Sequence, residues 1–177
     1  MIKRIIVPVD GSALSERALA PALAIAAQDG AQVVLVRTPV VEVAMVPTVE
    51  FFGNYSVRGL DQAVEKARQE AQAYLDILRH ANERPNLSVT AAVVEGDPAE
   101  AILQTAAEQQ ADLVVMSTHG YSGVTRWIMG SVTERVLANA PCPVLVIRSE
   151  LPLKKMLIPL DGSALSERAL TPALDLA

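Results

Sequence analysis

Residues 4–26, RIIVPVDGSALSERALAPALAIA, decide the fold. Residues 4–9 are a continuous apolar stretch of the kind that forms a strand buried on both faces of a parallel sheet. Asp10-Gly11-Ser12 ends this strand, and Ser12 is a suitable N-cap for a helix. Apolar residues then recur at helical spacing as far as Ala26. The stretch therefore predicts a strand, a turn and a helix, with a kink or a loosened turn at Pro21.

The same stretch recurs near the end of the chain. Residues 10–19 reappear unchanged as residues 161–170, which indicates one full unit of about 150 residues and the start of a second. We therefore expect a domain at residues 1–149, followed at residues 150–177 by a linker and an incomplete second repeat. That repeat predicts a strand at residues 154–160 and an amphipathic helix at residues 163–177. Both elements need to bury their apolar side chains, and we expect them to dock at the edge of the fifth strand, in this chain or in a partner chain.

Further apolar runs alternate with helical patterns along the rest of the chain. Strands are predicted at residues 33–37, 87–94, 113–117 and 144–147, and helices at residues 60–80, 98–110 and 131–139. Asp97-Pro98-Ala99-Glu100 marks the start of the second of these helices, with an N-cap, a proline in the first turn and a glutamate at the third position. The alternation predicts an α/β fold: a five-stranded parallel sheet, open and doubly wound, with helices on both faces.

One long connection interrupts this pattern at residues 39–59. It contains Phe51, Phe52 and Tyr55. A connection of this length inside a compact domain is typical of a functional flap or a mobile segment. Its aromatic residues either close over a ligand or pack against the sheet.

Composition narrows the class of protein. The chain has 177 residues, 51% of them hydrophobic, and a formal net charge of -5. Its basic residues are scattered, which argues against a nucleic-acid partner. No apolar run approaches the roughly 20 residues that cross a membrane, and the N-terminus does not resemble a signal peptide. The single cysteine, Cys142, excludes an internal disulfide and fits a reducing compartment. We expect a soluble, cytoplasmic protein.

The unusual residues follow the first and fourth predicted strands. In open α/β sheets, ligands bind outside the carboxyl ends of the strands, where the direction of winding reverses. Asp10-Gly11-Ser12 follows the first strand, and a glycine-containing loop from Thr118 follows the fourth. Gly130-Ser131 then begins a helix, whose first N–H groups can bind an anion. This pattern fits either a phosphate site or ordinary turns in which Asp10 only caps the chain. The phosphate loop of NTPases and the dinucleotide fingerprint are both absent.

Nothing in the sequence pairs a nucleophile with a base. His119 has no carboxylate or second histidine near it in sequence to orient it. Trp127 is interpreted as a packing anchor of the loop. We therefore do not expect an enzyme.

Two segments resemble the universal stress protein family. They are KRIIVPVDGSALSERAL at residues 3–19 and DLVVMSTHGYSGVTRWIMGSVTERVLANAPCPVLVIR at residues 112–148. The resemblance covers residues 1–149 and begins again at residues 154–177. The ATP-binding branch of the family carries Gly-x2-Gly-x9-Gly-Ser/Thr. Gly120, Gly130 and Ser131 match its later positions, whereas Ser117 stands where the first glycine is expected.

The resemblance implies an ATP site, with Mg²⁺ held by the phosphates. It implies that Asp10 lies against the adenosine, that Thr38 meets the adenine edge, and that Gly130, Ser131 and Val132 hold phosphates. Arg126 is a local candidate for a further phosphate contact. The remaining expected site residues are Pro8, Val9, Met116, Ser117, His119 and Gly120. A homodimer through the edge of the fifth strand is also implied. The resulting hypothesis is a nucleotide-dependent stress-response or signalling module, and the alternative is a dimerisation scaffold that binds no nucleotide.

Overall fold

The computed structural model describes residues 1–41, 57–118, 129–148 and 155–176. Phe51, Phe52, Tyr55 and Trp127, which the sequence singled out, lie outside the described residues.

The strands and helices follow the predicted order. The strands are β1 (Arg4–Pro8), β2 (Gln32–Arg37), β3 (Ser88–Val93), β4 (Leu113–Ser117) and β5 (Val144–Ile147). The helices within this unit are α1 (Ala13–Glu16), α2 (Leu19–Asp29), α3 (Val57–Asn82), α4 (Pro98–Glu108) and α5 (Ser131–Asn139). Each strand predicted within residues 1–149 is confirmed to within one residue at either end. Helix α3 is longer than expected because it begins at Val57 rather than at residue 60.

The sheet is parallel throughout, with strand order β3-β2-β1-β4-β5. Strands β2 and β3 are added in turn on one side of β1, and β4 and β5 are added on its other side. Winding therefore reverses between β1 and β4. The carboxyl ends of these two neighbouring strands meet at one edge of the sheet, which is where open α/β folds bind ligands.

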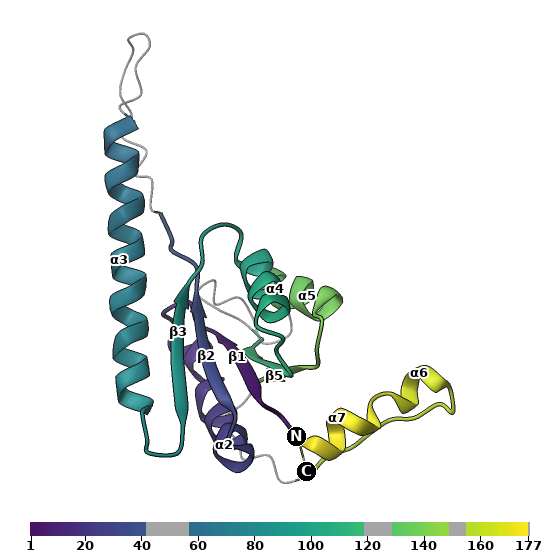
Figure 1. Ribbon diagram of the computed structural model, residues 1–177. Helices are drawn as coiled ribbons and strands as arrows, with labels where there is room; N and C mark the ends of the chain where they lie inside the picture. Colours follow the sequence, from purple (N-terminus) through teal and green to yellow (C-terminus); the bar gives the residue numbers. More distant parts are fainter. Residues whose placement is uncertain (42–56, 119–128, 149–154, 177) are drawn as a thin grey trace.

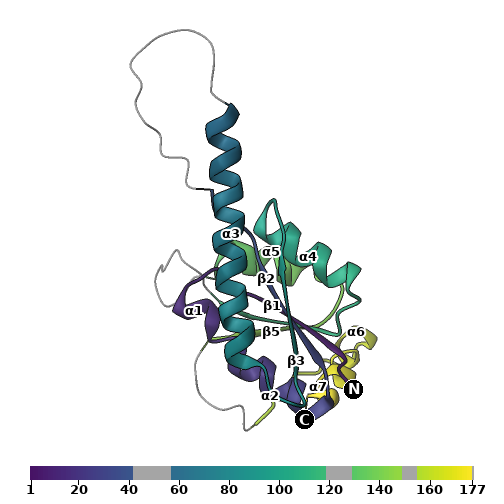
Figure 2. The same cartoon turned by 60° about the vertical axis from the view of Figure 1, so that its left-hand side comes forward.

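Alternate residues of the central strands build two separate cores. Ile5, Val7 and Leu35 belong to a buried cluster that also includes residues of α2 and α3. Ile6 and Val34 point to the other face of the sheet and belong to a second buried cluster, which also includes residues of α4 and α5. Figures 1 and 2 show α2 and α3 on one side of the sheet and α4 and α5 on the other. The predicted doubly wound sheet with helices on both faces is confirmed.

The break in the first helical segment lies one turn before Pro21. Helix α1 ends at Glu16 and α2 begins at Leu19, so Pro21 stands in the first turn of α2 and not inside a continuous helix. At the break, the N–H of Arg17 donates to Leu14 O and that of Ala18 to Ser15 O, the tighter i to i−3 pattern. A proline ring clashes with the carbonyl four residues earlier, so its effect falls at residue 17.

The second repeat forms two short helices but no strand. Helices α6 (Ala164–Glu167) and α7 (Leu170–Asp175) are present, whereas residues 155–160 have no strand partner. The predicted strand at residues 154–160 is therefore not formed over its described part. Leu157 keeps 91% of its surface exposed, although its counterpart Ile6 is fully buried.

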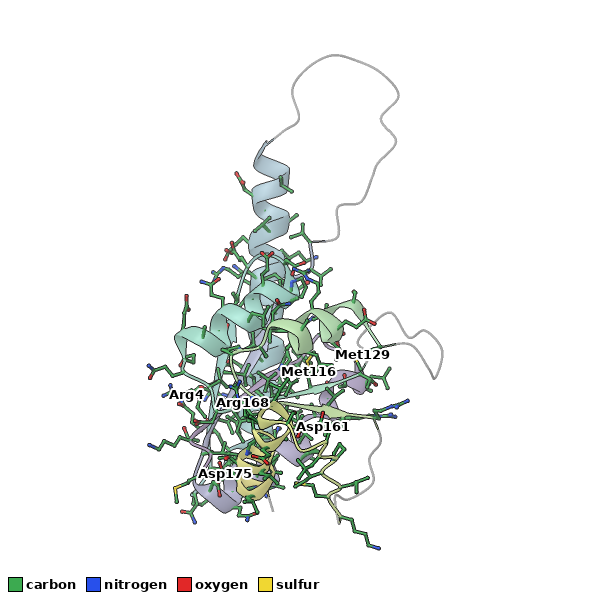
Figure 3. All side chains as sticks on the ribbon, turned by 90° about the vertical axis from the view of Figure 1, so that its right-hand side faces the viewer. Arg4, Met116, Met129, Asp161, Arg168 and Asp175 are labelled. Carbon is green, nitrogen blue, oxygen red and sulfur yellow. The ribbon has the colours of Figure 1, made fainter. Side chains whose placement is uncertain are left out.

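The segment also docks at a different place from the one expected. The Met1 amino group donates to Asp175 Oδ1 at 2.9 Å, and a shallow cavity separates α7 from the amino ends of β1 and β4. Figure 3 shows Asp175 well apart from Met116 and Met129, which mark the carboxyl end of β4 and the approach to α5. Within this chain the segment therefore does not lie along the edge of β5, whereas docking on a partner chain stays a prediction.

Candidate ligand site at the carboxyl ends of β1 and β4

The turn after β1 is built from its own side chains. The N–H of Ser12 donates to Asp10 Oδ1 at 2.9 Å, and the N–H of Asp10 donates to the hydroxyl of Ser15 at 3.2 Å. Ser12 Oγ accepts the N–H of Ser15 at 3.1 Å, which confirms Ser12 as the N-cap of α1. Gly11 has φ of +92°, a conformation that residues with a Cβ rarely adopt. Asp10 thus stands, half-buried, at the edge of the sheet next to the switch point.

Two hydrogen bonds fix the start of α5 against the end of β4, and a third joins that end of β4 to β5. Gly130 N–H donates to Thr118 O at 2.9 Å, and Thr118 N–H donates to Ile147 O at 3.2 Å. The buried hydroxyl of Thr133 donates to Ser117 O at 3.1 Å. The first turn of α5 is therefore held at the same edge of the sheet as the turn that carries Asp10.

In the part of the chain that the structure describes, no side chain caps the start of α5. Its N-cap is Gly130, whereas Ser12 caps α1 and Asp97 caps α4 with side-chain oxygens. Gly130 has φ of −67° and ψ of 146°, which any residue can adopt, so its backbone does not require glycine. A glycine at this position adds no side chain of its own in front of the first N–H groups. Uncapped N–H groups and the positive end of the helix dipole together suit an anion.

The other predicted site residues divide into buried and accessible groups. Val9, Met116 and Ser117 are buried, while Pro8, Thr38, Gly130 and Val132 are half-buried and Ser131 is exposed. Met116 belongs to the core cluster that also contains Ile6 and Val136. His119, Gly120 and Arg126 lie outside the described residues.

Ser117 stands where the resemblance expects a glycine. Gln110 is the one non-glycine residue with positive φ in the part of the chain that the structure describes, so Ser117 has ordinary backbone geometry. The serine therefore causes no backbone strain at the end of β4.

A cluster of three side chains behind the Asp10 turn was not predicted from the sequence. Arg37, the last residue of β2, places its Cζ 4.4 Å from the centroid of the Tyr74 ring on α3. The Tyr74 hydroxyl donates to Glu16 Oε1 at 2.7 Å. Burial, followed by the hydrogen bond to Glu16, raises the pKa of Tyr74, so the phenol stays protonated at neutral pH. An arginine that ends the apolar run VVLVR was the available signal.

The described residues contain no group of three or more His, Cys, Asp or Glu side chains placed to hold a metal ion. Within the same residues, no helix has both the length and the apolar character needed to cross a bilayer. Burial raises the pKa of the half-buried Cys142 thiol, which keeps it in its less reactive protonated form.

These observations define a small α/β domain whose parallel sheet has a polar turn and a helix start at its switch point, the place where such sheets bind ligands. Comparison with known families agrees and is more specific. The model of the universal stress protein family matches residues 1–148, and the chain belongs to that family.

Individual relatives support the same family. A universal stress protein of Thermus aquaticus is 39% identical over 150 residues, which cover 84% of this chain and all of the relative. Among solved structures, that of protein MJ0577 of Methanocaldococcus jannaschii superposes with a TM-score of 0.70 at 25% identity, over 84% of this chain and 97% of that one.

Two more distant structures share the fold and contain adenine nucleotides. A universal stress protein in complex with cAMP has a TM-score of 0.56 at 23% identity, over 83% of this chain and 97% of its own. A family member from Arabidopsis thaliana with AMP bound has a TM-score of 0.53 at 17% identity, over 82% and 91% of the two chains. At these identities the likeness concerns the fold.

Proposed function

We propose that this protein binds an adenine nucleotide, with ATP as the expected form, at the carboxyl ends of β1 and β4. Occupancy of the site would alter conformation or partner binding, as in a stress-response or signalling module. The observation that carries the proposal is the uncapped start of α5 at Gly130, held beside the turn of Asp10 at the switch point of the sheet. Adenine nucleotides in two structures of the same fold support the choice of ligand.

The chemistry of the available donors suits a phosphorylated nucleoside. N–H groups of the first turn of α5 and the hydroxyl of Ser131 would hold phosphates. Asp10 and the backbone of Thr38 would meet the adenosine, with Pro8 and Val9 shaping the wall, as the family resemblance implies. Mg²⁺ would enter with the phosphates, because ATP carries it as a chelate. His119, Gly120 and Arg126 remain proposed contacts of the same ligand.

Equilibrium binding of ATP to purified, nucleotide-stripped protein tests the proposal. We expect saturable binding of one ATP per chain, and mass spectrometry of unstripped protein should detect a co-purified adenine nucleotide. Gly130→Val should weaken binding more than about tenfold, or about 1.4 kcal/mol, because the new side chain blocks the approach to the N–H groups. Ser88→Val, an exposed substitution at the amino end of β3, is the matched control and should bind as the parent does. If the parent protein does not bind ATP, the result would support the alternative, a dimerisation scaffold that binds no nucleotide.

We also propose a homodimer formed through β5. Among the described residues this strand pairs with β4 alone, so its other edge is available for pairing with a second chain. Val144, Leu145 and Val146 are each only half-buried. Sedimentation equilibrium at tens of micromolar should report a dimer, and a monomer at that concentration would contradict the proposal.

A further inference from the structure

The sequence Asp-Gly-Ser-Ala-Leu-Ser builds the same turn twice in this protein. Ser12 N–H donates to Asp10 Oδ1 at 2.9 Å, and Ser163 N–H donates to Asp161 Oδ1 at the same distance. The two glycines have φ of +92° and +80°, and a serine Oγ accepts a backbone N–H at 3.1 Å in both copies. The local sequence is therefore sufficient to form the turn.

The surroundings of the two glycines differ. A Cβ built on Gly11 would lie 3.1 Å from Arg37 Nη2 and 3.4 Å from Arg37 Cζ. A Cβ built on Gly162 would have no atom of the described chain within 4 Å. The first turn is therefore covered by a guanidinium group, and the second, of identical sequence, is open.

Stacking fixes the position of this guanidinium, which forms no ion pair with any of the described residues. Arg37 Cζ lies 4.4 Å from the centre of the Tyr74 ring, and the hydroxyl of Tyr74 donates to Glu16 on α1. Arg37 Nε is buried and has no hydrogen-bond partner among the described residues. A planar cation stacked on an aromatic ring keeps its orientation without a carboxylate. Strand β2 and helix α3 thus both support the turn that follows β1.

We infer that Arg37 is a positioning residue for the ligand site: stacked on Tyr74, it holds the Gly11 turn, and with it Asp10, in the conformation that receives a ligand. A turn ordered in advance does not have to lose its conformational freedom when the ligand binds, which increases affinity. The positive charge of Arg37 also weakens the repulsion between the Asp10 carboxylate and an anionic ligand. The identity of the ligand rests on the proposed function, whereas the ordering of the turn does not.

Hydrogen exchange of the full chain without nucleotide tests the ordering directly. Residues 10–19 and 161–170 are identical, so their intrinsic exchange rates match, while Val7 and Ile158 give the longer peptides 7–19 and 158–170 different masses. We expect the turn of the first copy to exchange more slowly than the second. In Arg37→Met, which keeps the length of the side chain without its charge or plane, exchange in the first copy should rise about tenfold toward that of the second.

Three further variants separate the stacking from other effects. Tyr74→Phe keeps the ring and should leave the first turn protected, whereas Tyr74→Leu should behave as Arg37→Met does. Arg84→Met changes an exposed arginine between α3 and β3 and should alter neither copy. Unchanged exchange of the first turn in Arg37→Met would overturn the inference. Faster exchange across the whole sheet would also overturn it, because Arg37 would then support the domain in general.

Nucleotide binding supplies the second measurement. Arg37→Met should weaken ATP binding about tenfold, or about 1.4 kcal/mol, and Arg37→Lys should recover part of the loss because it restores the charge. If the parent binds no ATP but the exchange results hold, the proposed function fails and the positioning of the turn stands. If the parent binds ATP and Arg37→Met binds it equally well, Arg37 has no role in the ligand site and the inference fails.

Discussion

Thr133→Val should loosen the start of α5 without disturbing the rest of the protein. Thr133 is 3% exposed, and its hydroxyl donates to Ser117 O at 3.1 Å and, more weakly, to Thr118 O at 3.4 Å. Valine has nearly the same shape and cannot donate, so the substitution removes the side-chain link between α5 and the end of β4. The net contribution of such a hydrogen bond is about 0.5–1.5 kcal/mol, so the free energy of unfolding should fall by about 1 kcal/mol.

Thr105→Val is the matched control. Thr105 is also buried, at 6% exposure, but its hydroxyl donates to Ala101 O within its own helix at 2.7 Å. Such bonds to the preceding turn contribute little to helix stability. The free energy of unfolding should therefore change by less than about 0.5 kcal/mol, the range of substitutions without a specific mechanism.

Urea unfolding and ATP titration measure the two expected effects. Thr133→Val should lower the urea midpoint with an unchanged slope, because the surface exposed on unfolding stays the same. It should also weaken ATP binding several-fold, since the first turn of α5 is no longer tied to β4, whereas Thr105→Val should bind as the parent does. Equal midpoints and equal affinities for the two variants would refute the claim that Thr133 positions the start of α5.

Other consequences of the structure can be checked in the same preparations. Deleting residues 155–177 should leave the ATP stoichiometry per chain unchanged, because the second repeat lies at the amino ends of the strands, away from α5; a halved stoichiometry would show that Asp161 helps to form a site. Ser117→Gly should keep or improve ATP affinity, since it restores the family residue, and a large loss would contradict the proposed approach of the ligand to β4. The hydrogen bond from Glu100 N–H, followed by the ion pair with Arg135, lowers the pKa of Asp97 from 3.8. The part of its stabilisation that depends on charge is therefore present above pH 3.8 and is lost as pH falls through the lowered value, so Asp97→Ala should reduce the melting temperature more at pH 7 than in strong acid.

Sequence patterns predicted the elements whose signals are local. Buried strands such as β4 read as continuous apolar runs because both of their faces are covered. The start of α4 was predicted at the right residue because Asp97 and Pro98 each act on the adjacent N–H groups. Pro21 was recognised as a disruption, but its effect appears at Arg17, because a proline clashes with the preceding turn and not with its own.

The contacts that organise the candidate site were not predictable in this way. Arg37, Tyr74 and Gly11 come from β2, α3 and the turn after β1, and no spacing along the chain relates them. The link from Thr133 to Ser117 likewise joins a helix to the strand before it across an intervening loop. The sequence shows which strands end in polar residues. The side chains that hold these residues in place come from other elements, so they depend on which strands and helices become neighbours in the fold.

The repeated segment separates what local sequence specifies from what the fold adds. Both copies of the turn form the same hydrogen bonds and both end their first helix after four residues, so capping and the effect of proline are encoded locally. The strand is not. Residues 4–8 pair with β2 and β4, and Ile5 and Ile6 are fully buried, whereas their counterparts Met156 and Leu157 remain exposed and pair with no strand of the described residues. A parallel strand cannot satisfy its backbone groups alone, so an apolar run becomes one only where neighbours exist. The same reasoning applies to the site: Asp10 and Asp161 stand in equivalent turns, but only the turn of Asp10 follows a strand of the described sheet and lies beside Arg37.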